Sequence, residues 1–487
     1  MKHFQYRVSP LLIRVKALLI LVLLTSTGIA EAFQHGPLSE ESVQNKAHAD
    51  ELYYGVPKEF VEDLKEKTFN YMWEVVDTET WQTDDRYPSR NFTSVAATGF
   101  ALPSYIIGIH NQYISREEGA ERTLKTLSWL WNAPQGPNEQ GVTGYKGLFY
   151  HFLNYGTGTR FKTVELSTID TGLLMAGVLT AQSYFDKEND VEREIRALAD
   201  SLYLRVDWNW AMNDNETMSM GWHPEKGFIE AQWTGYNEAM VLLIQALGSP
   251  THPIPDNSWE VWTETYLWDE FYGYEHVNFG PLFGHQYSQM FIDFRGIQDA
   301  YMKEKGIDYF ENSRRATLSN RAYCMENPGN FAGYSENIWG LTASDGPANT
   351  VKNIDGEQVR FQTYTARGVA SDYHNDDGTI VPTAAGGSIP FAPEETLMAL
   401  YTMKEKFGDK LYTKYGFLDA FNLTFEEGGW FNKDYIGIDQ GPILIQLENL
   451  ESGLIWETLR KNPYIQAGLE KAGFTGGWLD FYGSNRN

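Results

Sequence analysis

The sequence predicts an all-α protein built as an (α/α)6 toroid, or barrel, with short β-hairpin insertions. Roughly a dozen segments show the 3.6-residue apolar period of a helix, and no fixed-period repeat indicates a solenoid. Some of these segments have one charged face, whereas others are apolar nearly all round. Two concentric rings of helices require this alternation, because the helices of an inner ring are buried on every side. A helical bundle is the competing arrangement.

The periodic segments define the expected helices. A segment with one charged face, such as 115–131 (SREEGAERTLKTLSWLW), is expected in the outer ring, and an apolar one, such as 171–181 (TGLLMAGVLTA), in the inner ring. Hairpins are expected at 144–167, around a Gly-Thr-Gly turn, and at 221–233, each leading into a candidate inner helix. The expected helices span residues 58–76, 94–110, 115–131, 167–185, 189–206, 235–248, 256–270, 286–303, 307–326, 391–407, 439–451 and 462–473.

The chain starts with the features of a secretory signal peptide. Residues 1–32 contain a basic start, a short apolar run and an Ala-Glu-Ala cleavage site. Residues 33–50 have the character of a disordered lead-in, and residues 51–487 contain no linker, so we expect one domain there. The mature protein is therefore expected to be periplasmic or secreted, monomeric and without a membrane anchor.

The composition is acidic and rich in aromatic residues. A formal charge of −26 argues against nucleic acid and anionic polysaccharide as partners and is compatible with a neutral substrate. Several aromatic residues lie in Gly- and Asn-rich loops, where they could cover the apolar faces of sugar rings or fill gaps between helices. The sequence has no Walker loop, dinucleotide glycine pattern, HExxH or Gly-x-Ser-x-Gly motif, so neither a cofactor nor a metal is expected.

Three acids stand at the starts of apolar helices. Asp170 fits the third position of a capping box that begins at Ser167. Asp439 fits an N-cap, because Pro442 is tolerated best in a first turn. Glu238 is expected in a first turn, where the helix dipole favours a negative charge. Taken singly, each acid is explained by capping.

Taken together, the three acids also predict a site. Inner helices of a toroid run parallel, so their N-terminal ends gather at one end of the cavity, where Glu165 and Glu230 would arrive on the preceding strands. Clustered carboxyl groups acquire different pKa values, so that one stays protonated while another stays ionised. Such a pair can protonate a glycosidic oxygen and activate a water molecule, which is the chemistry of an inverting glycosidase.

Further candidates for substrate binding lie in aromatic and polar segments between the helices. Trp233 and Tyr236 precede Glu238, and His285 lies at the entry to a helix, where a substrate hydrogen bond and a structural role are both open. The segment YSENIWGLTASDGP is a candidate cavity wall, and it contains Glu336, Trp339 and Asp345.

Four motifs in order resemble a known family. They are STIDTGLLMAGVL, QWTGYNEAMVLLIQALGSPTHP, YSENIWGLTASDGP and YIGIDQGPILIQLENLESGLIW, and together they resemble the glycoamylase-like domain of bacterial glycoside hydrolase family 144 over residues 55–475. The resemblance implies an (α/α)6 barrel, no catalytic metal and inverting hydrolysis of β-1,2-glucan. The family includes endo-acting enzymes and exo-acting enzymes that release sophorose.

The resemblance also implies roles for the three acids. Glu238 matches the general acid, and Asp170 or Asp439 the base, with relay of the proton through a water molecule or a substrate hydroxyl also open. Two other functions compete with hydrolysis. A polysaccharide lyase on the same toroid would need cations to neutralise a uronate, which the acidic composition disfavours. A non-catalytic glycan-binding protein would explain the aromatic loops but not the acids.

Overall fold

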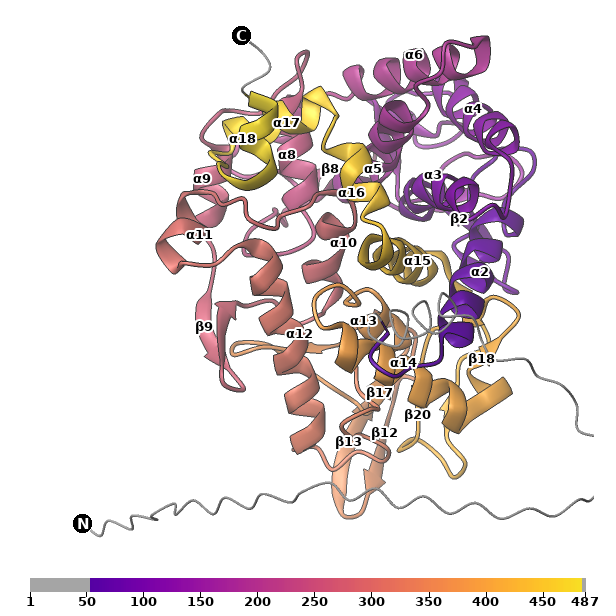
Figure 1. Cartoon of the computed structure of the whole chain (residues 1–487), viewed down its shortest axis with the longest axis vertical. Coiled ribbons are helices and arrows are strands. Elements are labelled where there is room, and N and C mark those ends of the chain that lie inside the picture. The colour runs from indigo at the N-terminus through magenta and orange to yellow at the C-terminus, as the bar shows by residue number, and fades with distance from the viewer. Residues whose placement is uncertain (1–52, 484–487) are drawn as a thin grey trace, which may run out of the picture. The chain divides into compact units, whose positions relative to one another are not determined.

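The computed structural model describes residues 53–483, so the expected signal peptide and lead-in lie outside the described residues. Most of the regular structure between residues 53 and 483 is helical (Figure 1). None of the helices in this part of the chain is long and apolar enough to cross a membrane.

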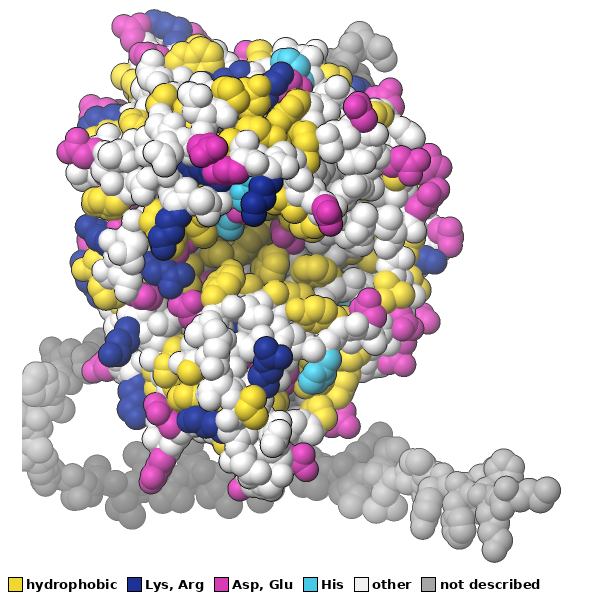
Figure 2. Space-filling view, turned by 180° about the vertical axis from the view of Figure 1, so that it is seen from behind, with side chains coloured by type: hydrophobic (Ala, Val, Ile, Leu, Met, Phe, Trp, Pro, Cys, Tyr) yellow, Lys and Arg dark blue, Asp and Glu magenta, His cyan; other side chains and the backbone are white. Residues whose placement is uncertain are grey.

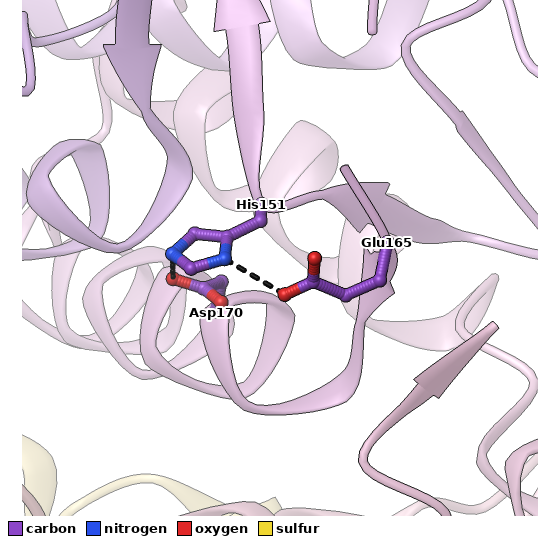
Figure 3. Close-up of side chains that lie close together, drawn as sticks. All are labelled: His151, Glu165 and Asp170. Atoms are coloured by element: carbon purple, nitrogen blue, oxygen red, sulfur yellow. Dashed lines mark hydrogen bonds and ion pairs between the residues drawn. The ribbon is translucent and has the colours of Figure 1, made fainter. Parts of the chain in front are cut away.

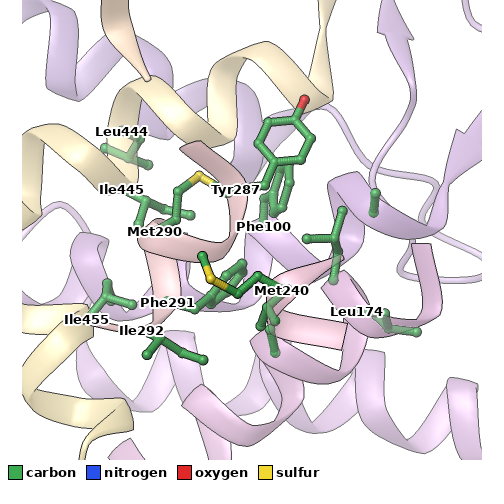
Figure 4. Close-up of a cluster of buried hydrophobic side chains, with 14 of the residues drawn as sticks. Phe100, Leu174, Met240, Tyr287, Met290, Phe291, Ile292, Leu444, Ile445 and Ile455 are labelled. Atoms are coloured by element: carbon green, nitrogen blue, oxygen red, sulfur yellow. The ribbon is translucent and has the colours of Figure 1, made fainter. Parts of the chain in front are cut away.

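One group of helices is buried nearly all round. Its members are α3 (Val95–His110), α5 (Thr168–Tyr184), α8 (Met240–Gly248), α10 (Phe283–Phe291), α13 (Pro382–Gly386) and α15 (Gly437–Glu451). Side chains from α3, α5, α8, α10 and α15 pack together in the cluster of Figure 4, where Phe100, Met240 and Phe291 meet. This burial explains why the corresponding sequence segments carry no charged face.

A second group of helices buries one face only. It comprises α2 (Lys58–Glu74), α4 (Arg116–Asn132), α6 (Asp190–Leu204), α12 (Tyr309–Glu326), α14 (Pro393–Phe407) and α17 (Pro463–Lys471). Each packs against a buried helix: α4 against α3, α6 against α5, and α17 against α8. Figure 1 shows α4 and α6 outside α3 in this way. The charged and apolar faces read from the sequence therefore correspond to exposed and buried sides.

Several expected helices have different limits in the structure. The expected helix at 286–303 is two helices, α10 and α11 (Ala300–Lys305), and the one at 256–270 is α9 (Ser258–Thr263) followed by a hairpin. That hairpin joins β9 (Trp268–Phe271) to β10 (Tyr274–Val277) through Gly273, whose φ of 82° favours glycine. Four helices were not predicted: α7 (Trp208–Ala211), α13, α16 (Leu454–Leu459) and α18 (Gly477–Gly483).

Short strands lead into the buried helices. A five-stranded antiparallel sheet contains β3 (Gly144–Tyr145), β4 (Leu148–Tyr150), β6 (Leu166–Ser167), β7 (Gly221–His223) and β8 (Gly227–Phe228). The hairpin expected at 221–233 is β7 and β8. The hairpin expected around the Gly-Thr-Gly turn is present as the antiparallel pair β4–β6, whereas β5 (Phe152–Asn154), closer to the turn, pairs with β2 (Phe92–Ser94). The strands β6, β2 and β22 (Tyr435–Ile436) end at the N-caps of α5, α3 and α15.

The remaining strands form small two- and three-stranded sheets. They are β1 (Arg86–Tyr87), β11 (Ala343–Ser344), β12 (Thr350–Ile354), β13 (Glu357–Phe361), β14 (Thr365–Ala366), β15 (Gly368–Val369), β16 (His374–Asn375), β17 (Thr379–Ile380), β18 (Tyr412–Thr413), β19 (Gly416–Phe417), β20 (Phe421–Asn422) and β21 (Trp430–Phe431). A 3-10 turn, η1 (Gly408–Lys410), follows α14. The pair β1–β22 joins two segments that are far apart in the sequence, with Arg86 opposite Ile436.

Pro442 lies inside α15 and not in its first turn, which corrects the sequence-based expectation that Asp439 is the N-cap. The helix begins at Gly437, so Asp439 occupies the third helical position. Proline has no N–H, so the carbonyl of Ile438 loses its helical partner. The Tyr287 hydroxyl donates a hydrogen bond to that carbonyl at 3.2 Å. This contact connects α10 to the start of α15.

Candidate active site

The N-terminal ends of five buried helices meet at a cavity of about 310 Å³. Residues at the starts of α3, α5, α10 and α15 line it, as does Glu238 just before α8. A hollow of this kind, with hydrophobic side chains inside and charged ones around it, is visible in Figure 2. The charged and aromatic lining consists of Asp85, Arg86, Phe92, His151, Phe152, Asp170, Glu238, Phe283, Tyr287 and Tyr364.

The three acids predicted from the sequence gather around this cavity. Asp170 and Glu238 belong to its lining. Asp439 follows the lining residues Ile436 and Ile438 at the start of α15, and it keeps only 5% of its surface exposed. Burial raises the pKa of Tyr287, and the charges of all three acids raise it further, so all three lie near this side chain. The starts of the buried helices, which the apolar patterns of the sequence predicted to converge, thus meet around this cavity.

Asp170 belongs to a charged trio with His151 and Glu165 (Figure 3). His151 Nδ1 lies 2.8 Å from Glu165 Oε1, and its Nε2 lies 3.6 Å from Asp170 Oδ1. Burial lowers the pKa of His151, but the two carboxylates outweigh it and raise the pKa to about 9. At neutral pH the imidazole is therefore a cation between two carboxylates.

The start of α5 fixes Asp170 in this trio. Ser167 is the N-cap, as the sequence predicted, and accepts a hydrogen bond from the backbone N–H of Asp170 at 3.2 Å. The predicted capping box is incomplete, because the Asp170 carboxylate bonds to the Ser167 hydroxyl and not to its backbone N–H. The Ser167 hydroxyl in turn donates to Asp170 Oδ2 at 2.5 Å. Burial raises the pKa of Asp170, and the His151 cation and the Ser167 hydroxyl oppose that increase. One capping residue thus holds both the backbone and the carboxylate.

The same trio is the group of described residues whose spacing could suit a metal ion. Ligand atoms of His151, Glu165 and Asp170 lie within 4.8 Å of one another. The Nδ1 of His151 contacts Glu165 and its Nε2 faces Asp170, which is the pairing of one imidazole with two carboxylates. The arrangement is accounted for by the ion pairs.

Glu238 stands on a turn just before α8, and not in its first helical turn as predicted. The N-cap is Ala239, and the helix begins at Met240. The Glu238 carbonyl accepts a hydrogen bond from Ser288 of α10 at 2.9 Å, and the same hydroxyl accepts from Val241 N–H at 2.9 Å. The turn before α8 is therefore attached to α10.

The carboxyl group of Glu238 is suited to carrying a proton. Its Oε2 is buried and has no hydrogen-bond partner. Burial, with a smaller contribution from the charge of Asp170, raises the pKa of Glu238 to about 7. A carboxyl group in this state can act as an acid near neutral pH.

A second carboxyl cluster adjoins the cavity on the side of α15. Arg86 contacts Asp85 at 3.0 Å and Asp345 at 2.9 Å. Asp419 accepts a hydrogen bond from the backbone N–H of Asp345 at 3.0 Å. Burial raises the pKa of Asp419 to about 7, and burial together with Asp419 raises the pKa of Asp439 well above its ordinary value. These groups hold fewer charges at neutral pH than their number of carboxyl groups suggests.

Aromatic rings form the rest of the wall. Phe92 packs on Phe152 with ring centroids 4.6 Å apart, and Phe283 packs on Tyr287 at 5.4 Å. Tyr364 is 53% exposed, yet it belongs to the cavity lining. Burial and then the charge of Asp439 raise the pKa of its hydroxyl. Aromatic rings beside carboxyl groups are typical of sites that bind sugars. The aromatic rings cover the apolar face of the sugar, and the carboxyl groups bind its hydroxyls.

All eight residues predicted to bind substrate lie outside the cavity lining. Trp233 is buried and donates a hydrogen bond to Thr168, the first residue of α5, at 2.9 Å. His285 and Tyr236 are buried against each other, with ring centroids 4.8 Å apart, and burial lowers the pKa of His285 to about 3. Glu230 and Glu336 are exposed, and Trp339 is fully buried. Of the predicted binding residues, Glu165 and Asp345 join the two charged clusters.

The sequence reasoning missed His151, Arg86, Asp419, Tyr287 and Tyr364. His151 lies in the apolar run LFYHFLNYG, and Asp419 lies in GFLDAFN, where a single polar residue interrupts an apolar run. A polar residue inside an apolar run was the sequence signal that could have identified these two residues as site candidates. Its meaning depends on pairing between distant strands, which no local pattern reveals.

Comparison with known proteins places the chain among glucan-degrading enzymes. The family model Glycoamylase, described as "Putative glucoamylase", matches residues 230–463. An exo β-1,2-glucooligosaccharide sophorohydrolase (non-reducing end) from Parabacteroides distasonis is 30% identical over 469 residues, which cover 88% of this chain and 60% of that protein. The chain thus spans about three fifths of the length of this curated relative.

Two solved structures agree with this placement. An endo-β-1,2-glucanase from Chitinophaga pinensis, in complex with sophorotriose and glucose, is 31% identical with a TM-score of 0.72, covering 88% of this chain and 99% of that one. A glucoamylase-like protein from Bacteroides uniformis is 32% identical with a TM-score of 0.73, covering 91% of this chain and 99% of that one. From these matches and the site described above, the chain belongs to the glycoamylase-like family of β-1,2-glucanases, glycoside hydrolase family 144.

Proposed function

We propose that the protein is a glycoside hydrolase that cleaves β-1,2-glucan or its oligosaccharides, by endo action or by release of sophorose. One observation carries this proposal: Glu238, whose pKa burial raises to about 7, and Asp170 line one aromatic-walled cavity. The substrates of the similar enzymes from P. distasonis and C. pinensis support the choice of glucan.

In the proposed reaction Glu238 donates its proton to the glycosidic oxygen while the bond from that oxygen to C1 breaks. A carboxylate base takes a proton from the water molecule that attacks C1 from the opposite face. The new C1 hydroxyl then has the inverted, α configuration. Glu165 and Asp345 complete the proposed site by holding substrate hydroxyls at the two charged clusters.

Asp170 or Asp439 supplies the base, either directly or through a water molecule or a substrate hydroxyl. The cation of His151, 3.6 Å from Asp170, favours the ionised form of Asp170. Asp439 instead adjoins Asp419, so its ionisation depends on that neighbour. The two variants Asp170→Asn and Asp439→Asn distinguish these assignments, because azide can replace the missing base function only in the variant that has lost the base.

The proposal extends to the architecture and to export. Along the chain the one-faced helices α2, α4, α6, α12 and α14 alternate with the buried helices, and the short α9 stands between the buried α8 and α10. This alternation supports six outer–inner repeats, an (α/α)6 barrel, in a single catalytic domain. The basic and apolar pattern of residues 1–32 supports an exported, periplasmic or secreted, monomeric enzyme.

The deciding assay is incubation of the purified protein with linear β-1,2-glucan, with β-1,3- and β-1,4-glucans as controls. We expect products from the β-1,2-glucan only. A ladder of oligosaccharides indicates endo action, whereas sophorose alone indicates exo action, and early proton NMR spectra should show the α-anomer.

Absence of products from every glucan would refute the proposal. In that case, tight glucan binding would indicate a glycan-binding protein, and ultraviolet absorbance of an unsaturated uronate from an acidic polysaccharide would indicate a lyase.

A further inference from the structure

Two buried carboxyl oxygens beside the cavity have no hydrogen-bond donor. They are Oδ1 of Asp419 and Oδ2 of Asp439, on side chains that are 2% and 5% exposed. Burial raises the pKa of both carboxyl groups, and the two lie close enough that Asp419 raises the pKa of Asp439 further. Two ionised carboxylates cannot bond to each other, because both are acceptors. A single proton between them satisfies both oxygens.

The other side of Asp419 is held by fixed donors. Its Oδ2 accepts from the backbone N–H of Asp345 at 3.0 Å and from the side-chain amide of Asn432 at 2.7 Å. The Asn432 amide also donates to Asp345 Oδ2 at 3.1 Å. Because Oδ2 is occupied in this way, Oδ1 of Asp419 is the atom left for Asp439.

The surroundings disfavour two negative charges on this pair. Asp85 and Asp345 are the nearest other acids, and Arg86 is already shared between them. Three phenols also face Asp439, namely Tyr71 from α2, Tyr287 from α10 and Tyr364 from the loop after β13. A neutral phenol can donate a hydrogen bond but offers no positive charge.

We propose that Asp419 is a positioning residue for the reaction. Asp419 shares one proton with Asp439 and thereby sets the charge of the Asp439 carboxyl group. The proposal rests on the proposed function, in which Asp439 is a candidate base. With one proton, the pair bears one negative charge and can accept one proton from the attacking water, directly or by relay. After the product leaves, the pair returns that proton to solvent and Glu238 takes one up from solvent, so the cycle is balanced.

Infrared difference spectroscopy of the protein without substrate tests the shared proton. The C=O band of protonated carboxyl groups is measured at neutral pH in the wild type, Asp419→Asn, Asp439→Asn and the double variant. A shared proton predicts that each single variant and the double variant lose the same one carboxyl equivalent. Loss of twice the amount in the double variant, or retention of the band in Asp419→Asn, would overturn the proposal. This readout needs no activity, so it stands apart from the proposed function.

The pH profile of kcat/KM tests the positioning role. The substitution Asp419→Asn removes a like charge and introduces an amide N–H that can donate to Asp439, so the pKa of Asp439 should fall. The limb on which activity rises with pH should then move to lower pH by about a unit or more. The matched control is Asp299→Asn. Asp299 is a buried acid that accepts hydrogen bonds from Trp259 and Tyr309, and its replacement should leave both limbs of the pH profile as in the wild type. An unshifted profile in Asp419→Asn would assign Asp419 a merely structural role.

Discussion

At the scale of single residues, Glu238 combines exposure to the cavity with a buried, unpartnered oxygen. We expect Glu238→Gln to lower kcat about 10²–10⁴-fold, since it removes a general acid but keeps the shape of the side chain. Folding, checked by circular dichroism, and binding of glucan should be retained. Activity close to that of the wild type would leave Glu238 as a structural residue at the start of α8.

The pKa of Glu238, about 7, also predicts the alkaline limb of the pH profile. The acid must be protonated to act, so kcat/KM should fall as pH rises through about 7. Initial rates on a short β-1,2-glucan, measured from about pH 4 to pH 9, check this. A plateau that continues to pH 9 would contradict the assignment of Glu238 as the acid.

The same raised pKa makes a prediction about stability. A carboxyl group whose pKa rises on folding stabilises the fold below its ordinary pKa, and that contribution is lost as pH rises through about 7. Glu238→Gln removes the buried charge that forms above that pH. The variant should therefore gain stability over the wild type at about pH 8.5, by about 1–2 kcal/mol, and little at pH 5. Denaturant unfolding at both pH values measures the difference, and an equal effect at the two would argue against a buried, titrating carboxyl.

At the scale of elements, local patterns and long-range pairing differ in what the sequence reveals. The cap of α5 was predictable because Ser167 and Asp170 are three residues apart and interact within one turn. The start of α8 was not, because the hydroxyl of Ser288, from another helix, accepts the Val241 N–H in place of a local cap. The charged partners His151 and Asp419 come from strands and loops whose pairing spans distant parts of the chain.

Substitution of Trp233 tests whether this side chain stabilises the start of α5 or binds substrate. Its indole N–H donates to Thr168 and it is outside the cavity lining, although the sequence favoured contact with substrate. We expect Trp233→Phe to lose about 1 kcal/mol of stability, the typical value of one hydrogen bond, with KM unchanged. A raised KM with unchanged thermal stability would return Trp233 to the binding site.

At the scale of the whole molecule, most of the architecture followed from the alternation of apolar and one-faced helices. Binary patterns report burial, and burial decides which helices lie inside. The sequence predicted the acids at helix starts for the same reason, since the starts of buried helices meet around one cavity. The aromatic wall was harder to predict, because buried and cavity-lining rings have the same composition. Trp339 and Phe283 illustrate this: one is in the core and the other faces the cavity.

The net charge of the chain gives a prediction about the substrate. With a formal charge of −26, the protein should repel anionic polysaccharides, and salt should screen that repulsion. A neutral β-1,2-glucan has no charge to repel, so kcat/KM should stay within about twofold between about 20 mM and about 300 mM NaCl. A glucan carrying anionic substituents, assayed in parallel, should instead become a better substrate as salt increases. If salt changed the rate on the neutral glucan several-fold while circular dichroism stayed constant, long-range charge would be acting on the reaction, and a neutral substrate would no longer account for the acidic composition.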